Sequence, residues 1–243
     1  MLKLEHVVWE LPGGEGIIKD IDLTIPDNQL VVVTGPNGGG KTTLAKLIAG
    51  LETPSAGRIL FQGKDITGLD ITERAKCGIG YAFQQPVRFK GLTVRDMLEL
   101  AAGKPLDEAQ LCALLGKVGL CADEYIGREL NASLSGGEIK RIEIATVLAR
   151  KAQLSIFDEP EAGIDLWSFT RLVETFEDLR KQKAGTLMII SHQERILEIA
   201  DEIVVIADGR VRAAGPKDEI LPGLLADEKT MRCPLGKEEV RGL

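Results

Sequence analysis

The octapeptide GPNGGGKT, residues 35–42, constrains the fold of this chain more than any other feature. It fits the pattern G-x-x-x-x-G-K-[ST] and lies between the apolar run QLVVV and the helix-like segment KTTLAKLIAG. A continuous β-branched run is typical of a strand buried on both faces of a parallel sheet. Strand, glycine-rich loop and helix in this order predict a phosphate-binding loop, because glycines let backbone N–H groups turn inward and a helix N-terminus attracts anions.

The loop predicts the first part of a nucleotide site. Lys41 has the length to reach the β- and γ-phosphates, and the Thr42 hydroxyl is placed to hold Mg²⁺. Gly39 stands where many such loops carry serine, which removes one side-chain contact and leaves the backbone cradle intact. The residues predicted to contact the phosphates are Gly35, Pro36, Asn37, Gly38, Gly39, Gly40, Lys41, Thr42 and Thr43.

A second strand ends in two acids. The run LSIFDE, residues 154–159, is apolar up to Asp158 and Glu159. Behind a phosphate-binding loop, the first acid is predicted to orient Mg²⁺ through water. The second is predicted to be the general base that activates the attacking water.

Three further polar residues follow predicted strands or turns. Gln84 comes after GYAF, where its amide can ligate Mg²⁺ and touch the attacking water or can simply cap the strand end. His192 ends the strand TLMIIS, so it faces the ligand crevice unless it is structural. Asp165 in EAGID is either close to the nucleotide or the N-cap of the next helix.

The turn SGGE, residues 135–138, opens a charged helix and allows two interpretations. Ser135 and Glu138 fit an S-x-x-E capping box, which begins a helix well. Alternatively, Ser135, Gly136, Gly137 and the helix N-terminus form an anion-binding surface.

Composition limits the classes of function. The chain has 243 residues, 44% hydrophobic residues and a formal net charge of −7, which argues against nucleic acid or an anionic membrane as the partner. No apolar run approaches the ~20 residues that span a bilayer, and the N-terminus does not resemble a signal peptide, so we expect a cytoplasmic protein without direct membrane insertion. The cysteines have no metal-site spacing and are expected to be small, reduced, buried hydrophobes.

The order of strands and helices predicts an α/β fold. Strand–helix alternation favours a mixed sheet core with a doubly wound part, antiparallel strands near the N-terminus and a small helical insertion. We predict a nucleotide-binding core over residues 1–86 and 134–215, interrupted by the helical insertion at 87–133. A polar tail at 216–243 is expected to lie over the surface, and EIVVIADGRV is expected to be one strand.

The order GPNGGGKT, Gln84, LSGGE, LSIFDE, AGID and His192 resembles the ATP-binding cassette family over nearly the whole chain. The resemblance implies a P-loop NTPase that hydrolyses ATP with Mg²⁺. It also implies a head-to-tail homodimer, in which Ser135, Gly137 and the helix N-terminus of one copy contact the γ-phosphate of ATP on the other. An aromatic residue stacks on adenine in this family, which suggests Trp9, although core packing of Trp9 is the alternative.

Within the family, three classes were compared. SGGEIKR and FQQPVRFKGLTV resemble the ATPase of the SUF iron–sulfur assembly system (SufC-type), which implies a SufB-like scaffold as the partner. The alternative is the ATP-binding subunit of a membrane transporter, and DEPEAGID departs from the usual pattern of both. DNA-repair and translation members fit least, because they carry long coiled coils or tandem cassettes.

Overall fold

The fold was analysed in a computed structural model that describes residues 1–85, 89–131 and 133–230. The start of the predicted insertion (Val87), Ala132 and the tail from residue 231, with Cys233, lie outside the described residues. The strands are β1 Leu2–Glu10, β2 Gly16–Ile25, β3 Leu30–Thr34, β4 Ala56–Phe61, β5 Lys64–Asp65, β6 Ile79–Ala82, β7 Leu154–Asp158, β8 Thr186–Ile190, β9 Glu202–Ala207 and β10 Arg210–Pro216. The helices are α1 Lys41–Ala49, α2 Ile71–Lys76, α3 Val94–Ala102, α4 Glu108–Lys117, α5 Ala122–Tyr125, α6 Gly136–Ala149, α7 Leu166–Lys181, α8 Glu194–Glu198 and α9 Lys217–Thr230.

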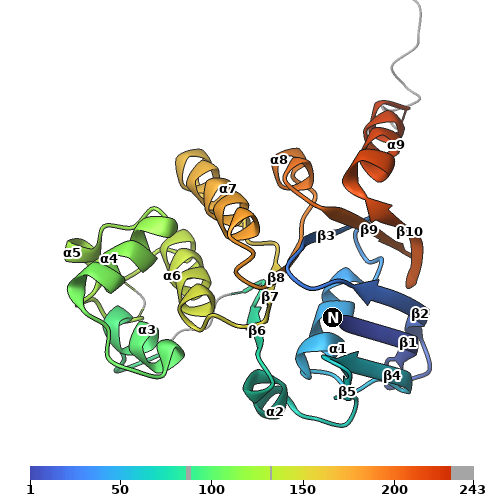
Figure 1. The fold of residues 1–243 in the computed structure, drawn as a ribbon, viewed down its shortest axis with the longest axis horizontal. Coiled ribbons are helices and arrows are strands. Elements are labelled where there is room, and N and C mark those ends of the chain that lie inside the picture. Colours follow the sequence, from blue (N-terminus) through green and yellow to red (C-terminus); the bar gives the residue numbers. More distant parts are fainter. Residues whose placement is uncertain (86–88, 132, 231–243) are drawn as a thin grey trace, which may run out of the picture.

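Two sheets form the core of the molecule (Figure 1). The six-stranded sheet has the order β10-β9-β3-β8-β7-β6, and its strands are parallel except for the antiparallel edge strand β10. The four-stranded sheet β2-β1-β4-β5 is antiparallel throughout. This arrangement confirms the predicted fold class.

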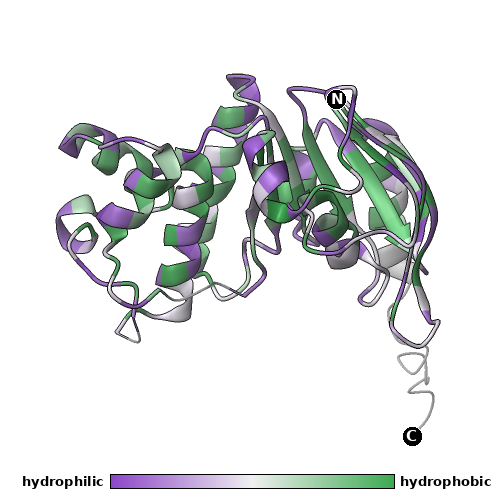
Figure 2. Cartoon of the chain, turned by 90° about the horizontal axis from the view of Figure 1, so that it is seen from below, coloured by the Kyte–Doolittle hydropathy of each residue, from purple (hydrophilic) through white to green (hydrophobic). Residues whose placement is uncertain are grey.

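The apolar run of β3 is explained by packing on both of its faces. Val31 and Val33 belong to a core cluster shared with α1 and the four-stranded sheet. Leu30 and Val32 belong to a second cluster shared with α6 and α7. Since successive side chains of a strand point to opposite faces, only a strand buried on both sides needs four apolar residues in a row. Figure 2 shows the green, hydrophobic strands inside the molecule and helices that carry both colours.

The helical group α3–α5 projects to one side of the core and packs on α6 (Figure 1). Capping boxes begin α3 at Thr93 with Asp96, and α4 at Asp107 with Gln110. The third helix of this group, α5, ends at Tyr125. The domain boundaries given above stay a prediction.

Two expectations outside the site were wrong, those for EIVVIADGRV and for the cysteines. EIVVIADGRV is not one strand but most of a hairpin, because Asp208 and Gly209 both have positive φ and make the tight turn between β9 and β10. The tail expected to lie over the surface is helical over α9, with Pro222 inside the helix. Cys112 and Cys121 are exposed and Cys77 is half-buried, so these thiols are not core residues.

Among the described residues, no helix combines the length and the apolar character that a membrane span requires.

Candidate functional site

Side chains at the carboxyl ends of four neighbouring parallel strands form the site. Strand β3 is followed by the phosphate loop (residues 35–40), and β6 is followed shortly by Gln84. Strand β7 ends at Asp158, which precedes Glu159, and β8 is followed shortly by His192. Parallel strands bring their carboxyl ends to one edge of a sheet, which is where α/β proteins bind ligands. The structure therefore brings together residues that are far apart in the sequence.

The backbone of the phosphate loop packs closely against strand β9. A Cβ atom added to Gly35 would lie 2.0 Å from the carbonyl oxygen of Ile206, and one added to Gly39 would lie 2.8 Å from the same atom. Gly35 also has a φ of 128°, which side chains rarely adopt. The glycine at position 39, in place of serine, is thus required by this close approach of two backbones.

Lys41 is folded into the loop. Its Nζ donates to the carbonyl oxygens of Gly35 at 2.7 Å and Pro36 at 2.9 Å. Burial lowers the pKa of Lys41, and the nearby carboxylates of Glu159 and Asp158 oppose that shift. The two carbonyl groups hold the ammonium group inside the loop.

Asp158 is fully buried and bonded to two hydroxyl groups. Thr42 Oγ1 donates to its Oδ1 at 3.1 Å, and the Tyr81 hydroxyl donates to its Oδ2 at 3.1 Å. Burial raises the pKa of Asp158, while both hydrogen bonds lower it. Hydroxyl and carboxylate oxygens are the hard ligands that Mg²⁺ prefers, so Thr42 and Asp158 fit a magnesium site. Sequence analysis missed Tyr81.

Glu159 and Gln84 are directly bonded, since Gln84 Nε2 donates to Glu159 Oε2 at 2.9 Å. Glu159 has a φ of 46°, an uncommon conformation for a residue other than glycine. The bond joins the residue predicted to be the base to the residue predicted to touch the metal ion and the attacking water.

His192 follows β8 and lies beside Thr34, with 3.4 Å between its Nδ1 and Thr34 Oγ1. Burial and the positive charge of Lys41 lower the pKa of His192. The imidazole is therefore neutral at neutral pH and can donate one hydrogen bond while it accepts another. The preceding residue, Ser191, is buried and donates to Glu161 Oε1 at 2.6 Å.

A hollow of about 590 Å³ lies over the phosphate loop; we call it the nucleotide hollow. Trp9, Leu11 and Ile17 line one end, and Gln84 and Glu159 line it as well. The remaining lining is Asn37, Gly38, Gly39, Gly40, Lys41, Thr42 and Thr43. Trp9 therefore lines the same hollow as the phosphate loop. Its side chain is half-buried.

The signature turn, residues 135–138, lies at a different hollow, of about 510 Å³, which we call the signature hollow. It is lined by Ser135, Gly136, Gly137, Glu138, Lys140, Arg141, Ala162, Gly163 and Asp165. The lining residues of the two hollows do not overlap. Asp165 accepts hydrogen bonds from the backbone N–H groups of Trp167 and Ser168, so its role as the N-cap of α7 is confirmed.

Ser135 and Glu138 form the capping box that the sequence suggested. Ser135 N donates to Glu138 Oε2 at 2.7 Å, and Glu138 N donates to Ser135 Oγ at 3.2 Å. Glu138 also accepts hydrogen bonds from the Tyr125 hydroxyl and from Arg128, which sequence analysis missed. Led by the Tyr125 bond, these contacts lower the pKa of Glu138 to about 2.

The low pKa of Glu138 predicts a pH-dependent contribution to stability. A carboxyl group with a pKa of about 2 in the folded state and an unfolded value of 4.5 stabilises the fold above pH 4.5. That stabilisation is lost as the pH falls from 4.5 towards 2. We expect Glu138→Gln to flatten the dependence of Tm on pH in this window, measured by circular dichroism. A matched change at Glu174, an exposed residue of α7, should leave the slope unchanged; equal slopes for wild type and Glu138→Gln would contradict the prediction.

Lys140 links helix α6 to the ends of strands β6 and β7 and was also missed. Its side chain is 1% exposed. Its Nζ donates to the carbonyl oxygens of Phe83, Gln84 and Asp158, with 3.1 Å to each of the last two. Burial lowers the pKa of Lys140, and the surrounding carboxylates, led by Glu143, oppose that shift. One ammonium group thus joins the backbone that follows β6 to the backbone at the end of β7.

Comparisons with known proteins agree with this geometry. The family model described as "ABC transporter" matches residues 18–162. An ABC transporter ATP-binding protein of Methanocaldococcus jannaschii (MJ0035) is 39% identical over 216 residues, covering 86% of each chain. The sulfate/thiosulfate import ATP-binding protein CysA of Synechocystis is 36% identical over 86% of this chain, which spans 59% of CysA. The structure of cbiO1 from Clostridium perfringens, part of an ABC transporter complex, superposes with a TM-score of 0.75 at 27% identity over 96% of each chain.

Proposed function

Because this chain belongs to the ABC transporter family of ATP-hydrolysing proteins, we propose that two copies bind MgATP head to tail and drive a conformational change in a transmembrane partner. The observation that carries the dimer is the separation of the two hollows. A single chain offers a phosphate cradle in one place and the signature turn in another. A second copy turned head to tail supplies the turn that the first copy needs.

The residues of the two hollows and of the neighbouring strand ends have distinct roles in this proposal. The phosphate loop and Lys41 hold the phosphates, and Thr42, Asp158 and Gln84 hold Mg²⁺, which neutralises the charge on the β- and γ-phosphates. Glu159 accepts a proton from the attacking water, and neutral His192 donates a hydrogen bond to a γ-phosphate oxygen. Ser135, Gly137 and the N-terminus of α6 contact the nucleotide held by the other copy.

We assign the base-binding end of the hollow to Trp9. An indole ring beside the phosphate loop offers a flat apolar face on which a purine ring can stack, and Leu11 and Ile17 extend that apolar surface.

Replacement of Trp9 by alanine is expected to raise the KM for ATP about tenfold, because stacking of a base on an aromatic ring contributes about 1–3 kcal/mol. The kcat should change little, since the indole is remote from the γ-phosphate. Steady-state phosphate release measures both constants. Trp167, which is 84% exposed on α7, provides the matched control; a Trp9→Ala variant with the KM of wild type would contradict the stacking role.

The relatives reported above carry transporter names, which supports a membrane transporter subunit as the partner over the iron–sulfur scaffold suggested by the sequence. A SUF-type function remains the second candidate because of one observation, the sequence SGGEIKR. Within it, Glu138 is locked by the capping box and Lys140 is buried against the catalytic strands.

Isolation of the chain from its native cells, with and without detergent, separates these two candidates. A stoichiometric multi-span membrane protein that is recovered only with detergent supports the transporter proposal. A stoichiometric soluble scaffold that accepts iron and sulfide overturns that proposal and supports the second candidate. ATP hydrolysis by the isolated complex should be present in both cases.

A further inference from the structure

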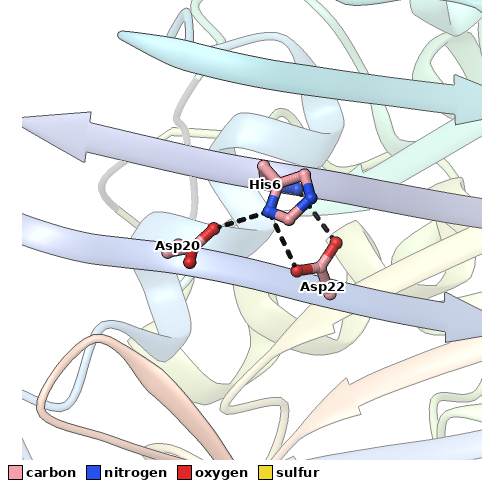
Figure 3. A group of neighbouring side chains, drawn as sticks. All are labelled: His6, Asp20 and Asp22. Atoms are coloured by element: carbon pink, nitrogen blue, oxygen red, sulfur yellow. Dashed lines mark hydrogen bonds and ion pairs between the residues drawn. The ribbon is translucent and has the colours of Figure 1, made fainter.

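A side-chain cluster of His6, Asp20 and Asp22 lies on the outer face of strands β1 and β2, outside both hollows (Figure 3). His6 Nδ1 is 2.9 Å from Asp20 Oδ1 and 3.3 Å from Asp22 Oδ2. All three side chains are exposed, and one ligand atom from each lies within 4.8 Å of the others. The family site described above uses none of these residues.

The spacing of these atoms matches the ligand shell of a metal ion. An ion held about 2.0–2.2 Å from nitrogen and oxygen ligands places neighbouring ligand atoms about 3 to 3.5 Å apart. The two distances from His6 Nδ1 fall at this spacing. A neutral imidazole has a single Nδ1 position, which can donate to only one of the two carboxylates that face it. A metal ion at the same place satisfies the nitrogen and both carboxylates together.

The backbone holds the three groups in this arrangement. His6 N donates to Asp22 Oδ1 at 3.1 Å, which leaves Oδ2 of that carboxylate facing the imidazole. The pairing of β1 with β2 shifts register between Leu4 and Val7, and both His6 (φ 50°) and Asp20 (φ 61°) have left-handed backbone conformations. Gly57 of β4 accommodates this irregularity, because a Cβ atom there would lie 2.2 Å from the carbonyl oxygen of His6.

We propose that His6, Asp20 and Asp22 form a surface site for one divalent transition-metal ion, with zinc as the ion to be tested. One imidazole nitrogen with two carboxylates is a ligand set for zinc and neighbouring transition metals rather than for a Mg²⁺ or Ca²⁺ cage made of oxygens. With three protein ligands, water would fill the remaining coordination positions of the ion. The affinity is therefore expected to be micromolar.

Protons compete with the metal at this site. The hydrogen bond to Asp20, followed by the charges of Asp22, Asp20 and Glu5, raises the pKa of His6. Glu5 is itself paired with Lys3 and Arg58. Since zinc binds only the neutral imidazole, the affinity should rise as the pH increases through the pKa of His6.

Titration of the full chain with zinc chloride, without nucleotide or magnesium, tests the proposal by isothermal calorimetry at pH 8. We expect one micromolar site in the wild type and a loss of affinity of at least about 10-fold in both His6→Ala and Asp20→Asn, because even the loss of an outer-shell partner of a metal ligand costs about 10–100-fold. His192→Ala is the matched control, because it removes the only other histidine and should leave this site intact. Circular dichroism verifies that each variant is folded.

Two results of the titration would overturn the proposal. One is wild-type protein without saturable zinc binding below about 0.1 mM, which corresponds to a free energy of about −5.5 kcal/mol. The other is micromolar binding that persists in His6→Ala, which would assign the zinc to the cysteines or to the magnesium site. A zinc-soaked crystal should show an anomalous peak at His6 Nδ1, and a peak only elsewhere would also refute it.

Discussion

Glu159→Gln is expected to lower the ATPase rate at least about 100-fold, because a positioned general base contributes about 10²–10⁴ to a rate. Glutamine has nearly the same shape as glutamate and keeps an oxygen that can accept the hydrogen bond from Gln84 Nε2. It cannot take up the proton of the attacking water. ATP should therefore still bind but persist unhydrolysed, and the nucleotide that joins two copies should trap them as a dimer.

Phosphate release and light scattering coupled to gel filtration measure the two parts of this result. The matched control is Glu174→Gln, an exposed glutamate of α7 that is paired with Arg171, and it should behave as wild type. Wild-type turnover in Glu159→Gln would remove Glu159 from the role of base. A variant that is inactive yet monomeric with saturating ATP would leave the base in place and argue against the head-to-tail dimer.

Lys140→Met should produce the second large effect, a loss of both stability and turnover. Methionine fills a similar volume but leaves the carbonyl oxygens of Phe83, Gln84 and Asp158 without the ammonium donor. Each buried polar group left unpaired costs about 1–3 kcal/mol, so we expect the free energy of unfolding to fall by at least about 2 kcal/mol. A small displacement of Gln84 and Glu159 can lower kcat about 100-fold.

Urea unfolding and steady-state kinetics test this prediction. Lys181→Met is the control, since Lys181 is exposed on α7 and forms only a surface pair with Glu177, of the kind that contributes about 0.3–0.5 kcal/mol. Lys140→Gln retains a donor and should be intermediate, which keeps the test informative if the methionine variant does not fold. A stable, fully active Lys140→Met would show that the three carbonyl contacts do not position the site.

The residues that the sequence predicted well are those whose position follows from local order. The phosphate loop is recognisable because strand, glycines, lysine and helix are consecutive, and Asp158 and His192 because each follows an apolar strand. Their meeting at one edge follows from the parallel arrangement of the strands. The Ser135 and Glu138 capping box is likewise a local pattern four residues long.

The missed residues depend on contacts between distant segments. Tyr81 is one aromatic residue in a short strand, and its partner Asp158 is 77 positions away. Lys140 looks like a solvated residue of a charged helix until the Phe83 and Gln84 backbone is folded over it. The Asp208–Gly209 turn was a recognisable local signal that was overlooked, whereas the left-handed backbone at His6 and Asp20 follows no sequence rule.

The separation of the two hollows has a consequence for how activity depends on protein concentration. In the proposed head-to-tail arrangement half of each site lies on another copy, so the activity per chain should fall on dilution and a free chain should hydrolyse little ATP at low concentration. A partner that holds two copies replaces their encounter by an intramolecular closure, with an effective concentration on the order of millimolar for short flexible connections. A complex that holds two copies should therefore hydrolyse ATP, whereas surplus free chains should consume little of it.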